Sequence, residues 1–153
     1  RFNPNLYDNG KLCLSLLGTW RGDKGSESWN PKTSSLHVLF TSIQSQILTT
    51  QPYFNEPGYE KEINTPLGAI KNEEYNNKIR MYTLTHAVRD ILNNMNLYPQ
   101  FTEVIRKHFT LKKKYILDLC EKWKNECKEN LTYKKQDFEK INKEIEDLLN
   151  KQN

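Results

Sequence analysis

Near its beginning the chain reads Asn3-Pro4-Asn5-Leu6-Tyr7-Asp8-Asn9-Gly10-Lys11-Leu12-Cys13-Leu14. Asn-Pro and Asn-Gly dipeptides favour turns, because asparagine hydrogen-bonds to nearby backbone and glycine accepts a positive φ. The segment therefore predicts a turn around Pro4, a second turn ending at Gly10, and a short strand-like piece through Cys13. Two side-chain amides, those of Asn3 and Asn5, precede the Cys13 thiol.

The setting of Cys13 separates it from the other two cysteines. Cys120 and Cys127 stand seven residues apart on one predicted helix, which favours core packing. Because no Cys-x-x-Cys pair is present, we expect free thiols and neither a disulfide framework nor a metal site. Composition alone does not decide whether Cys13 is a nucleophile or a buried structural thiol. A Cys/His hydrolase is a poor fit, since all three histidines are explained as helix residues.

Glycine and proline divide the chain into a turn-rich first part and a mostly helical second part. All six glycines and five of the six prolines precede residue 69. Asn30-Pro31 is typical of a helix start, which predicts a core-facing helix over about residues 31–49. Its apolar residues at helical spacing are Leu36, Leu39, Phe40, Ile43 and Ile47. Residues 51–68 are expected to form a long loop with aromatic anchors.

Helical periodicity runs from about residue 72 to the end of the chain. The expected helices lie within residues 72–95, 99–109, 115–127 and 138–149. The last of them has a narrow apolar stripe in a background rich in Lys and Glu. Such a helix is marginal alone, so we expect it to pack against a partner surface.

Composition excludes several classes of protein. With 153 residues, 36% apolar and 27% charged, the chain is long enough for one folded domain. No apolar run reaches the ~18 residues of a membrane span, and no signal peptide is recognisable, so we expect a cytoplasmic or nuclear protein without a membrane partner.

Nine lysines against four acids from Lys107 to Lys135 form a basic patch. The interleaved acids favour a solvated face over nucleic-acid binding.

The segment from Asn3 to Leu17 resembles the active-site segment of ubiquitin-conjugating enzymes, in which a His-Pro-Asn turn and an Asn-Gly turn precede a catalytic Cys-Leu. The spacing of eight residues from Asn5 to Cys13 matches that family. Trp29-Asn30-Pro31 resembles its Trp-Ser-Pro turn. Three stretches look like the subgroup of BRUCE-type giant inhibitors of apoptosis and large hybrid conjugating and ligase enzymes: Leu17 to Trp20, Pro52 to Tyr59, and Ile105 to Phe109.

The resemblance implies an α+β fold like that of ubiquitin-conjugating enzymes, with an active-site strand and loop, a crossover helix and C-terminal helices. It implies that Cys13 accepts ubiquitin or a ubiquitin-like protein as a thioester from a ubiquitin-activating enzyme and passes it to lysines of substrate proteins. A ligase is a further implied partner, and no cofactor is expected. The Asn5 amide is the candidate oxyanion donor, and holding the turn is an equally good explanation of it.

The same resemblance implies two parts of the chain. Residues 1–129 are expected to be the C-terminal portion of the catalytic domain, and residues 130–153 a Lys/Glu-rich helical extension. Because the family's domain begins earlier, with a helix and an antiparallel sheet, the chain is expected to lack that N-terminal part. A non-catalytic relative that binds ubiquitin or acts as a scaffold is the alternative function.

Further site residues follow from the resemblance. Asn3 stands where the family has histidine, and together with Pro4 it is expected to keep the active-site turn. Trp20 lies in a loop that is expected to be exposed over residues 18–28 and to shape access to the thiol, with simple packing as the alternative role of Trp20. Trp29 and Pro31 are expected to belong to the active-site turn and loop. Asn30-Pro31-Lys32 replaces the family's Ser-Pro-Ala, which often helps to engage ligases.

Two candidates lie where the family places a residue near the incoming lysine. They are Asn72 and Glu73, at the junction expected between the long loop and the next helix. An acidic, solvated helix start explains both residues equally well.

Overall fold

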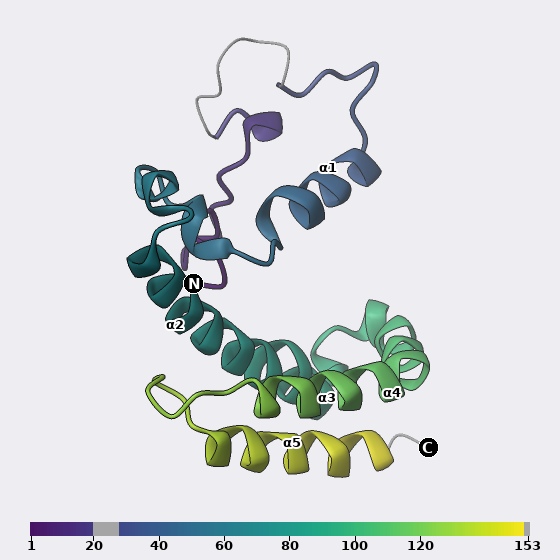
Figure 1. Cartoon of the computed structure of the whole chain (residues 1–153). Helices are drawn as coiled ribbons and strands as arrows, with labels where there is room; N and C mark the ends of the chain where they lie inside the picture. The colour runs from purple at the N-terminus through teal and green to yellow at the C-terminus, as the bar shows by residue number, and fades with distance from the viewer. Residues whose placement is uncertain (20–27, 152–153) are drawn as a thin grey trace. The chain divides into compact units, whose positions relative to one another are not determined.

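The computed structural model describes residues 1–19 and 28–151 (Figure 1). The chain forms two compact units, Arg1–Asn76 and Asn77–Asn153. Its α-helices are α1 (Leu36–Ser42), α2 (Pro66–Tyr82), α3 (Asp90–Asn93), α4 (Thr102–Asn125) and α5 (Lys135–Asn150). Short 3-10 helices lie at Ser15–Leu17, Pro52–Asn55, Tyr59–Glu62, Met95–Leu97 and Pro99–Phe101, and π-helical segments at Ile43–Ile47 and Thr83–Arg89.

β structure is limited to one antiparallel bridge, between Leu6 and Leu12, in the part of the chain that the structure describes. After Cys13 the chain bends into the 3-10 helix Ser15–Leu17, which Gly18 ends with a φ of 65°. Glycine adopts that left-handed conformation without a Cβ clash. The strand-like piece is therefore short, and the α+β fold is not confirmed by these mainly helical residues.

The helix expected over residues 31–49 begins later than its sequence pattern predicts. The Asn30 side chain accepts a hydrogen bond from the Lys32 amide at 2.9 Å, so it caps an isolated turn and not the helix. Polar side chains that bond locally compete with helix formation, and the run Thr33-Ser34-Ser35 follows. Helix α1 starts after Ser35, whose hydroxyl accepts from the Val38 amide.

The predicted core-facing side of this helix is buried mainly at its C-terminal end. Ile47 is 1% exposed, whereas Leu36 is 65% and Phe40 63% exposed. The last turn is π-helical, from Ile43 to Ile47, and the Leu48 amide bonds the Ile43 carbonyl at 3.1 Å. The sequence pattern was therefore right about the helical period and wrong about how much of the stripe is buried here.

Aromatic anchors hold the segment between α1 and α2, as the sequence predicts. The Tyr53 ring stacks on Tyr59 with ring centroids 4.7 Å apart and meets Tyr75 edge-on at 6.2 Å. The Tyr53 hydroxyl donates to Glu62 Oε2 at 3.0 Å, and Lys71 Nζ lies 2.7 Å from Glu62 Oε1. A tyrosine, a carboxylate and an ammonium group thus tie two 3-10 helices to α2.

Helix α2 starts at Pro66, six residues before the helical pattern had indicated. The Thr65 hydroxyl accepts a hydrogen bond from the Gly68 amide at 3.0 Å, as an N-cap residue does, and Pro66 is at the first helical position. A Cβ on Gly68 would clash with the Glu62 carbonyl. This close approach explains a glycine inside the first turn of a helix.

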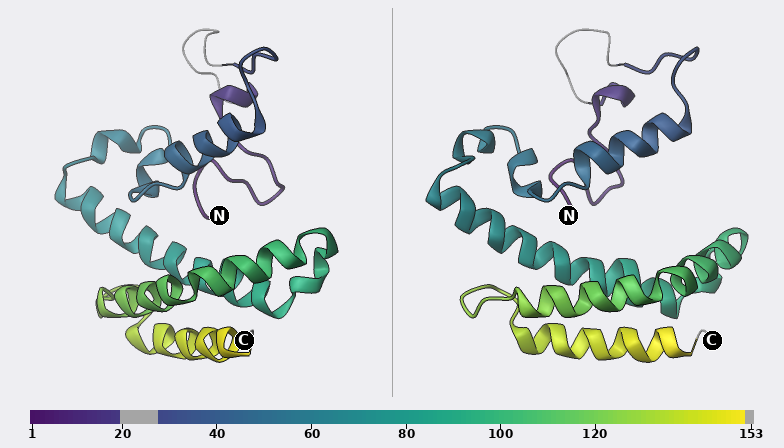
Figure 2. Two further views of the ribbon diagram at one scale, coloured as in Figure 1. Left: turned by 90° about the vertical axis from the view of Figure 1, so that its right-hand side faces the viewer. Right: turned by 45° about the vertical axis from the view of Figure 1, so that its right-hand side comes forward.

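The second unit has a helical core. Figures 1 and 2 show α4 and α5 side by side along their lengths. Helix α4 is continuous across two of the predicted helices, because the chain has no glycine or proline after Pro99. The buried core residues are Met81, Leu84, Leu92, Phe109, Ile116, Cys120, Phe138, Ile141, Ile145 and Leu149. The narrow stripe of α5 therefore has the partner surface it was expected to need.

Side-chain amides reinforce this helix pairing. Asn142 Nδ2 on α5 donates to the Cys120 carbonyl on α4 at 3.0 Å. Asn77 binds both backbone groups of Tyr133, donating to its carbonyl at 3.1 Å and accepting from its amide at 2.8 Å. Because buried polar groups cost free energy unless they are paired, these bonds define how α5 returns along α4.

Replacing Phe138 with alanine is predicted to reduce the free energy of unfolding by about 3–5 kcal/mol, because Phe→Ala substitutions leave a cavity at a packed site. Phe138 is 0% exposed in the core of the second unit. Urea unfolding followed by circular dichroism measures this loss. The matched control is Glu139→Ala, at an exposed position of the same helix, and equal effects of the two substitutions would contradict the packing.

Glu62→Gln is predicted to destabilise the first unit at neutral pH. This loss of stability should become progressively smaller below pH 4.5, the ordinary pKa of this carboxyl. The Lys71 hydrogen bond lowers the Glu62 pKa in the folded chain, with a smaller contribution from Tyr53. The unfolded chain therefore binds more protons between the two values, and the stability from this carboxylate is lost as pH falls through the folded pKa.

Thermal unfolding of both proteins, from neutral pH to below that lowered pKa, tests the pH dependence. Glu139→Gln is the matched control, since Glu139 lies exposed in the second unit. A difference between Glu62→Gln and the parent that stayed constant across the range would show that the Glu62 pKa is not lowered by folding.

Candidate active site

Asn5 and Cys13 are held together by hydrogen bonds in both directions. The Cys13 amide donates to the Asn5 carbonyl at 2.9 Å, and Asn5 Nδ2 donates to the Cys13 carbonyl at 3.0 Å. The Tyr7 amide bonds the Lys11 carbonyl at 2.9 Å, and Gly10 turns the chain with a φ of 84°. The eight-residue interval between the asparagine and the cysteine is therefore a small hairpin that places the amide beside the cysteine backbone.

The Asn3 side chain fastens this hairpin to the end of the first helical segment. Asn3 is 0% exposed, its Nδ2 donates to the Ile47 carbonyl at 2.7 Å, and its Oδ1 accepts from the Asn5 amide at 2.8 Å. Pro4, between the two asparagines, is buried. The turn expected at Asn3-Pro4-Asn5 is present, with asparagine where the resemblance had histidine.

Thr19 supports the same segment from the other side, and the sequence did not single it out. The Leu14 amide donates to Thr19 Oγ1 at 3.0 Å, and the Thr19 hydroxyl is within hydrogen-bond distance of the carbonyls of Leu12 and Leu14. The backbone on both sides of Cys13 is thus held by one hydroxyl group. A Gly-Thr pair after an apolar run was a weak signal for such a contact.

The three thiols differ in surroundings. Cys13 is 5% and Cys120 1% exposed, and Cys127 is half-buried. Burial raises the pKa of Cys120 to about 11, so this thiol stays protonated at neutral pH. Burial also raises the pKa of Cys127, whose Sγ lies 3.1 Å from the Tyr133 carbonyl. Cys127 follows the end of α4 and does not share a helix with Cys120, which corrects the sequence prediction.

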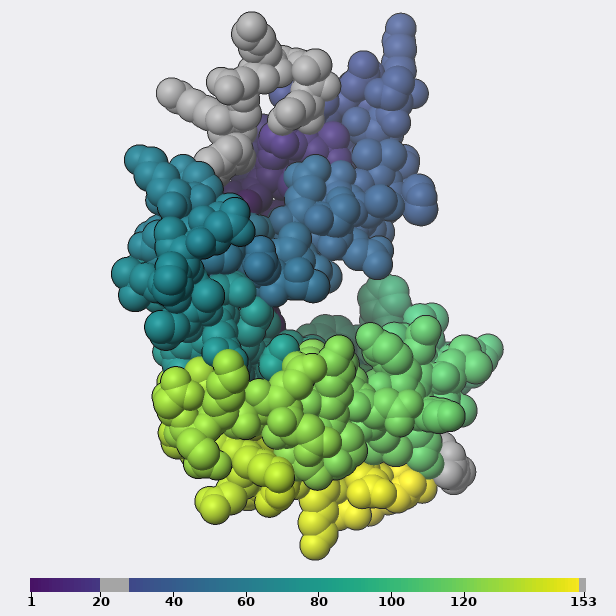
Figure 3. Space-filling view, in the orientation of Figure 1, coloured from purple at the N-terminus to yellow at the C-terminus, as the bar shows by residue number. Residues whose placement is uncertain are grey.

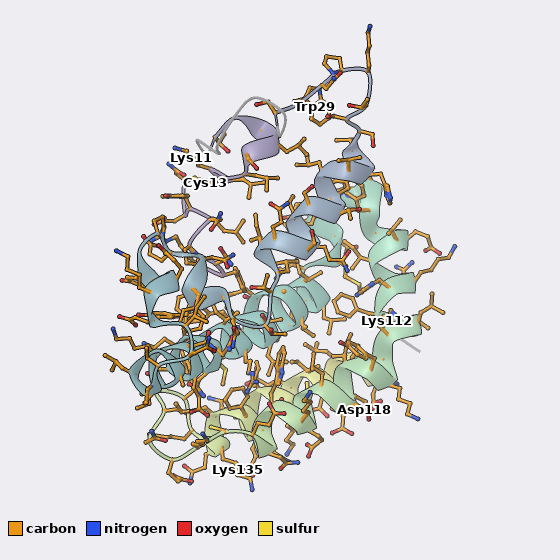
Figure 4. The ribbon with its side chains drawn as sticks, turned by 45° about the horizontal axis from the view of Figure 1, so that its top comes forward. Lys11, Cys13, Trp29, Lys112, Asp118 and Lys135 are labelled. Carbon is orange, nitrogen blue, oxygen red and sulfur yellow. The ribbon has the colours of Figure 1, made fainter. Side chains whose placement is uncertain are left out.

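The tryptophan and proline predicted beside the thiol are exposed. Trp29 is 42% exposed and Pro31 also lies at the surface. Figure 4 shows Lys11 next to Cys13 and Trp29 apart from them in that view. Trp20 and most of the predicted loop lie outside the described residues. No recorded contact joins Trp29 or Pro31 to Cys13 within residues 1–19 and 28–151.

Asn72 and Glu73 lie inside α2, beyond its first turn, and not at a loop-to-helix junction. This corrects their expected placement, because Thr65 and Pro66 start the helix earlier. Asn72 lines a cavity of about 430 Å³ together with Phe54 and Ile63. Its Oδ1 is buried without a hydrogen-bond partner.

Within residues 1–19 and 28–151, no three His, Cys, Asp or Glu side chains gather in an arrangement able to bind a metal ion. No described helix has the length and apolar character required to cross a membrane.

Comparison with curated proteins identifies relatives over most of the chain. It is 45% identical over 97% of its length to Probable ubiquitin-conjugating enzyme E2 R521 of Acanthamoeba polyphaga mimivirus. It is 50% identical over 80% of its length to the human dual E2 ubiquitin-conjugating enzyme/E3 ubiquitin-protein ligase BIRC6. It is 46% identical over 80% of its length to Probable ubiquitin-conjugating enzyme protein 17 of Caenorhabditis elegans. No protein-family model matches.

The chain covers a small part of each relative: 10% of the viral protein, 2% of the human protein and 16% of the nematode protein. The resemblance predicted from the Asn3 to Leu17 segment is confirmed, and the BRUCE type is represented by the human relative. By sequence, the chain is a homologue of the ubiquitin-conjugating enzymes.

Proposed function

We propose that this chain is part of a ubiquitin-conjugating enzyme in which Cys13 carries ubiquitin, or a ubiquitin-like protein, as a thioester. The observation that supports this most directly is the reciprocal hydrogen bonding of Asn5 and Cys13. It occurs in the segment that resembles the family's active site, in a chain whose relatives are named ubiquitin-conjugating enzymes. The partners would be the modifier, its activating enzyme, substrate proteins and a ligase.

The proposed chemistry has two acyl transfers. In the first, the Cys13 thiolate attacks the carbonyl carbon of the modifier's thioester on the activating enzyme, and that enzyme's cysteine thiolate leaves. In the second, a substrate lysine amine attacks the same carbon, an amide bond forms, and the C–S bond to Cys13 breaks. The amine loses its proton to solvent, and the Cys13 thiolate is regenerated. A thiolate is nucleophilic enough for this role without an adjacent base.

Asn5 can hold the cysteine and also stabilise the tetrahedral intermediate. An asparagine amide nitrogen carries two N–H groups, and one of the two is used by the bond to the Cys13 carbonyl. The second N–H is proposed to donate to the oxyanion. Fixed donors of this kind stabilise charge that develops in the transition state.

Other parts of the predicted site remain proposals. Trp29 and Pro31, both exposed, are proposed to shape the approach to the thiol, as is Trp20. Of the two lysine-position candidates, Asn72 has the better support over Glu73, because Asn72 lines a cavity and its buried Oδ1 has no hydrogen-bond donor. An ammonium group would supply one after a rotation of the amide.

The wider assignment is also proposed. An α+β fold of the family's type is supported by the homology, with residues 1–129 in the conjugating domain and residues 130–153 as an extension. The match to the human protein covers 123 residues and the match to the viral protein 149. This difference is expected if the viral protein shares the extension and the human protein does not. A place in the cytoplasm or nucleus is consistent with the free thiols.

A ubiquitin-binding or scaffold role is the second candidate function. The low exposure of Cys13, 5%, favours it, because a buried thiol is less accessible to an acyl donor than an exposed one. The buried setting and the family motif thus point to different functions, and formation of the thioester distinguishes them.

With activating enzyme, ATP and ubiquitin, the protein is predicted to form an adduct that a thiol reductant removes. Cys13→Ala should abolish the adduct, whereas Cys120→Ala and Cys127→Ala should leave it. Denaturing gels with and without reductant measure it. A reducible adduct in Cys13→Ala would assign the acyl group to another thiol. The scaffold role would be favoured if the parent formed no adduct with any modifier, both as this chain and within a longer protein that contains it.

Asn5→Ala is predicted to accept ubiquitin but to transfer it to free lysine ~10²–10³-fold more slowly, the cost of losing one oxyanion donor. Asn3→Ala is the matched control, because it loosens the same turn while the chain keeps the Asn5 side chain as a candidate oxyanion donor. Single-turnover discharge assays measure both rates. Equal slowing by the two substitutions would show that Asn5 acts by positioning Cys13.

A further inference from the structure

Helix α4 carries an apolar stripe on its surface in addition to its buried face. The stripe consists of Phe101, at the helix start, and Val104, His108, Leu111 and Tyr115, spaced alternately by three and four residues. The exposed fractions of its apolar members are 59% for Phe101, 64% for Val104, 81% for Leu111 and 63% for Tyr115. This spacing is the seam of a coiled coil, narrower than the stripe that buries a helix in a globular core.

The opposite side of α4 already has a partner. Phe109, Ile116 and Cys120 point into the core of the second unit and are at most 8% exposed. Packing of this side keeps the helix formed, so the stripe is a rigid surface about 21 Å long, from the rise per residue of an α-helix. The first half of α4 lies at the surface of this unit (Figure 3). A partner would pay little ordering entropy on the α4 side.

Lysines flank the stripe on both sides. By helical position, Lys112 lies along one edge and Lys107 and Lys114 along the other. The exposed Asp118 lies on that second edge, one turn beyond the end of the stripe. Lys107 Nζ is 3.5 Å from Glu103, whereas Lys112 and Lys114 have no recorded acidic partner in the described part of the chain. The Lys112 ammonium lies 5.9 Å from the centre of the Tyr115 ring. Figure 4 labels Lys112 and Asp118 on this helix.

We infer that the α4 stripe is a docking surface for an amphipathic helix whose apolar seam is bordered by aspartate or glutamate. The apolar residues would pack against a matching seam, and the lysine edges would meet the acidic edges of the partner. Complementary charge along both edges also sets the register and excludes basic helices.

The lysine edges argue against a second copy of this chain as the occupant. Two copies packed stripe to stripe would bring lysine edges together, and like charges at an interface are unfavourable. A membrane surface is also less well matched. Membrane-bound helices present a wide apolar face, whereas this seam is narrow and contains His108.

Two synthetic peptides of about three heptads test the inference. Both carry the same leucine seam, and they differ in having glutamate or lysine at the flanking positions. Fluorescence anisotropy with the 153-residue chain is expected to show that the acidic peptide binds at least ~10-fold more tightly than the basic peptide, with the difference shrinking at high salt. Lys112→Glu with Lys114→Glu should reverse the preference.

Leu111→Asp is expected to weaken binding of the acidic peptide at least ~10-fold without changing the circular dichroism spectrum, because this side chain is exposed. Thr110→Asp, one position away and outside the stripe, is the matched control and should leave binding unchanged. These assays use neither Cys13 nor ubiquitin, so their outcome is independent of the proposed catalytic function.

Three outcomes would overturn the inference. The first is absence of saturable binding by the acidic peptide, or binding that Leu111→Asp leaves unchanged. The second is a dimer in sedimentation that Leu111→Asp dissociates, which would assign the stripe to a second copy. The third is that the protein sediments with vesicles of phosphatidylserine and phosphatidylcholine, that Leu111→Asp abolishes this, and that the peptide does not bind. That result would assign the stripe to a membrane.

Discussion

The buried amide of Asn3 is the contact on which the geometry of the first unit depends. One side chain donates to the Ile47 carbonyl and accepts from the Asn5 amide, so it connects segments 44 residues apart in sequence. The first bond is buried and the second partly buried, so an unpaired partner would carry much of the cost of desolvation. The position of Cys13 follows, because Asn5 holds the cysteine backbone and Asn3 holds Asn5.

Local patterns in the sequence predicted the parts of the structure that local interactions decide. The turns at Pro4 and Gly10, the aromatic anchors and the stripe of α5 could all be read from turn residues and periodicity. The start of α1 could not, because Asn30 and Ser35 are both good caps, and which one begins a helix depends on the competing hydrogen bonds between them. The start of α2 was misread because Pro66 and Gly68 look like loop residues until the contact with Glu62 is known.

Long-range contacts explain the remaining differences in the candidate site. Periodicity marks Leu36, Phe40 and Val104 as apolar positions of helices, but it does not show whether another segment covers them, and they are exposed. The contact of Thr19 with the backbone around Cys13 joins residues outside any periodic pattern, so the sequence carried no periodic signal for it. The spacing of Asn5 and Cys13, by contrast, was recognised through the resemblance to the family's motif, and in the structure the Asn-Gly turn between them brings the two residues into hydrogen-bond contact.

The hydrogen bonds of Cys13 have a consequence for how a cargo on its sulfur can move. Asn5 binds the amide and the carbonyl of this residue, so the backbone contributes almost no freedom. Any group joined to Sγ moves by rotation about the χ1 torsion and about the bonds beyond it. The orientations available to a large adduct are then set by these few side-chain torsions and their preferred wells, so fewer orientations toward an incoming nucleophile have to be searched.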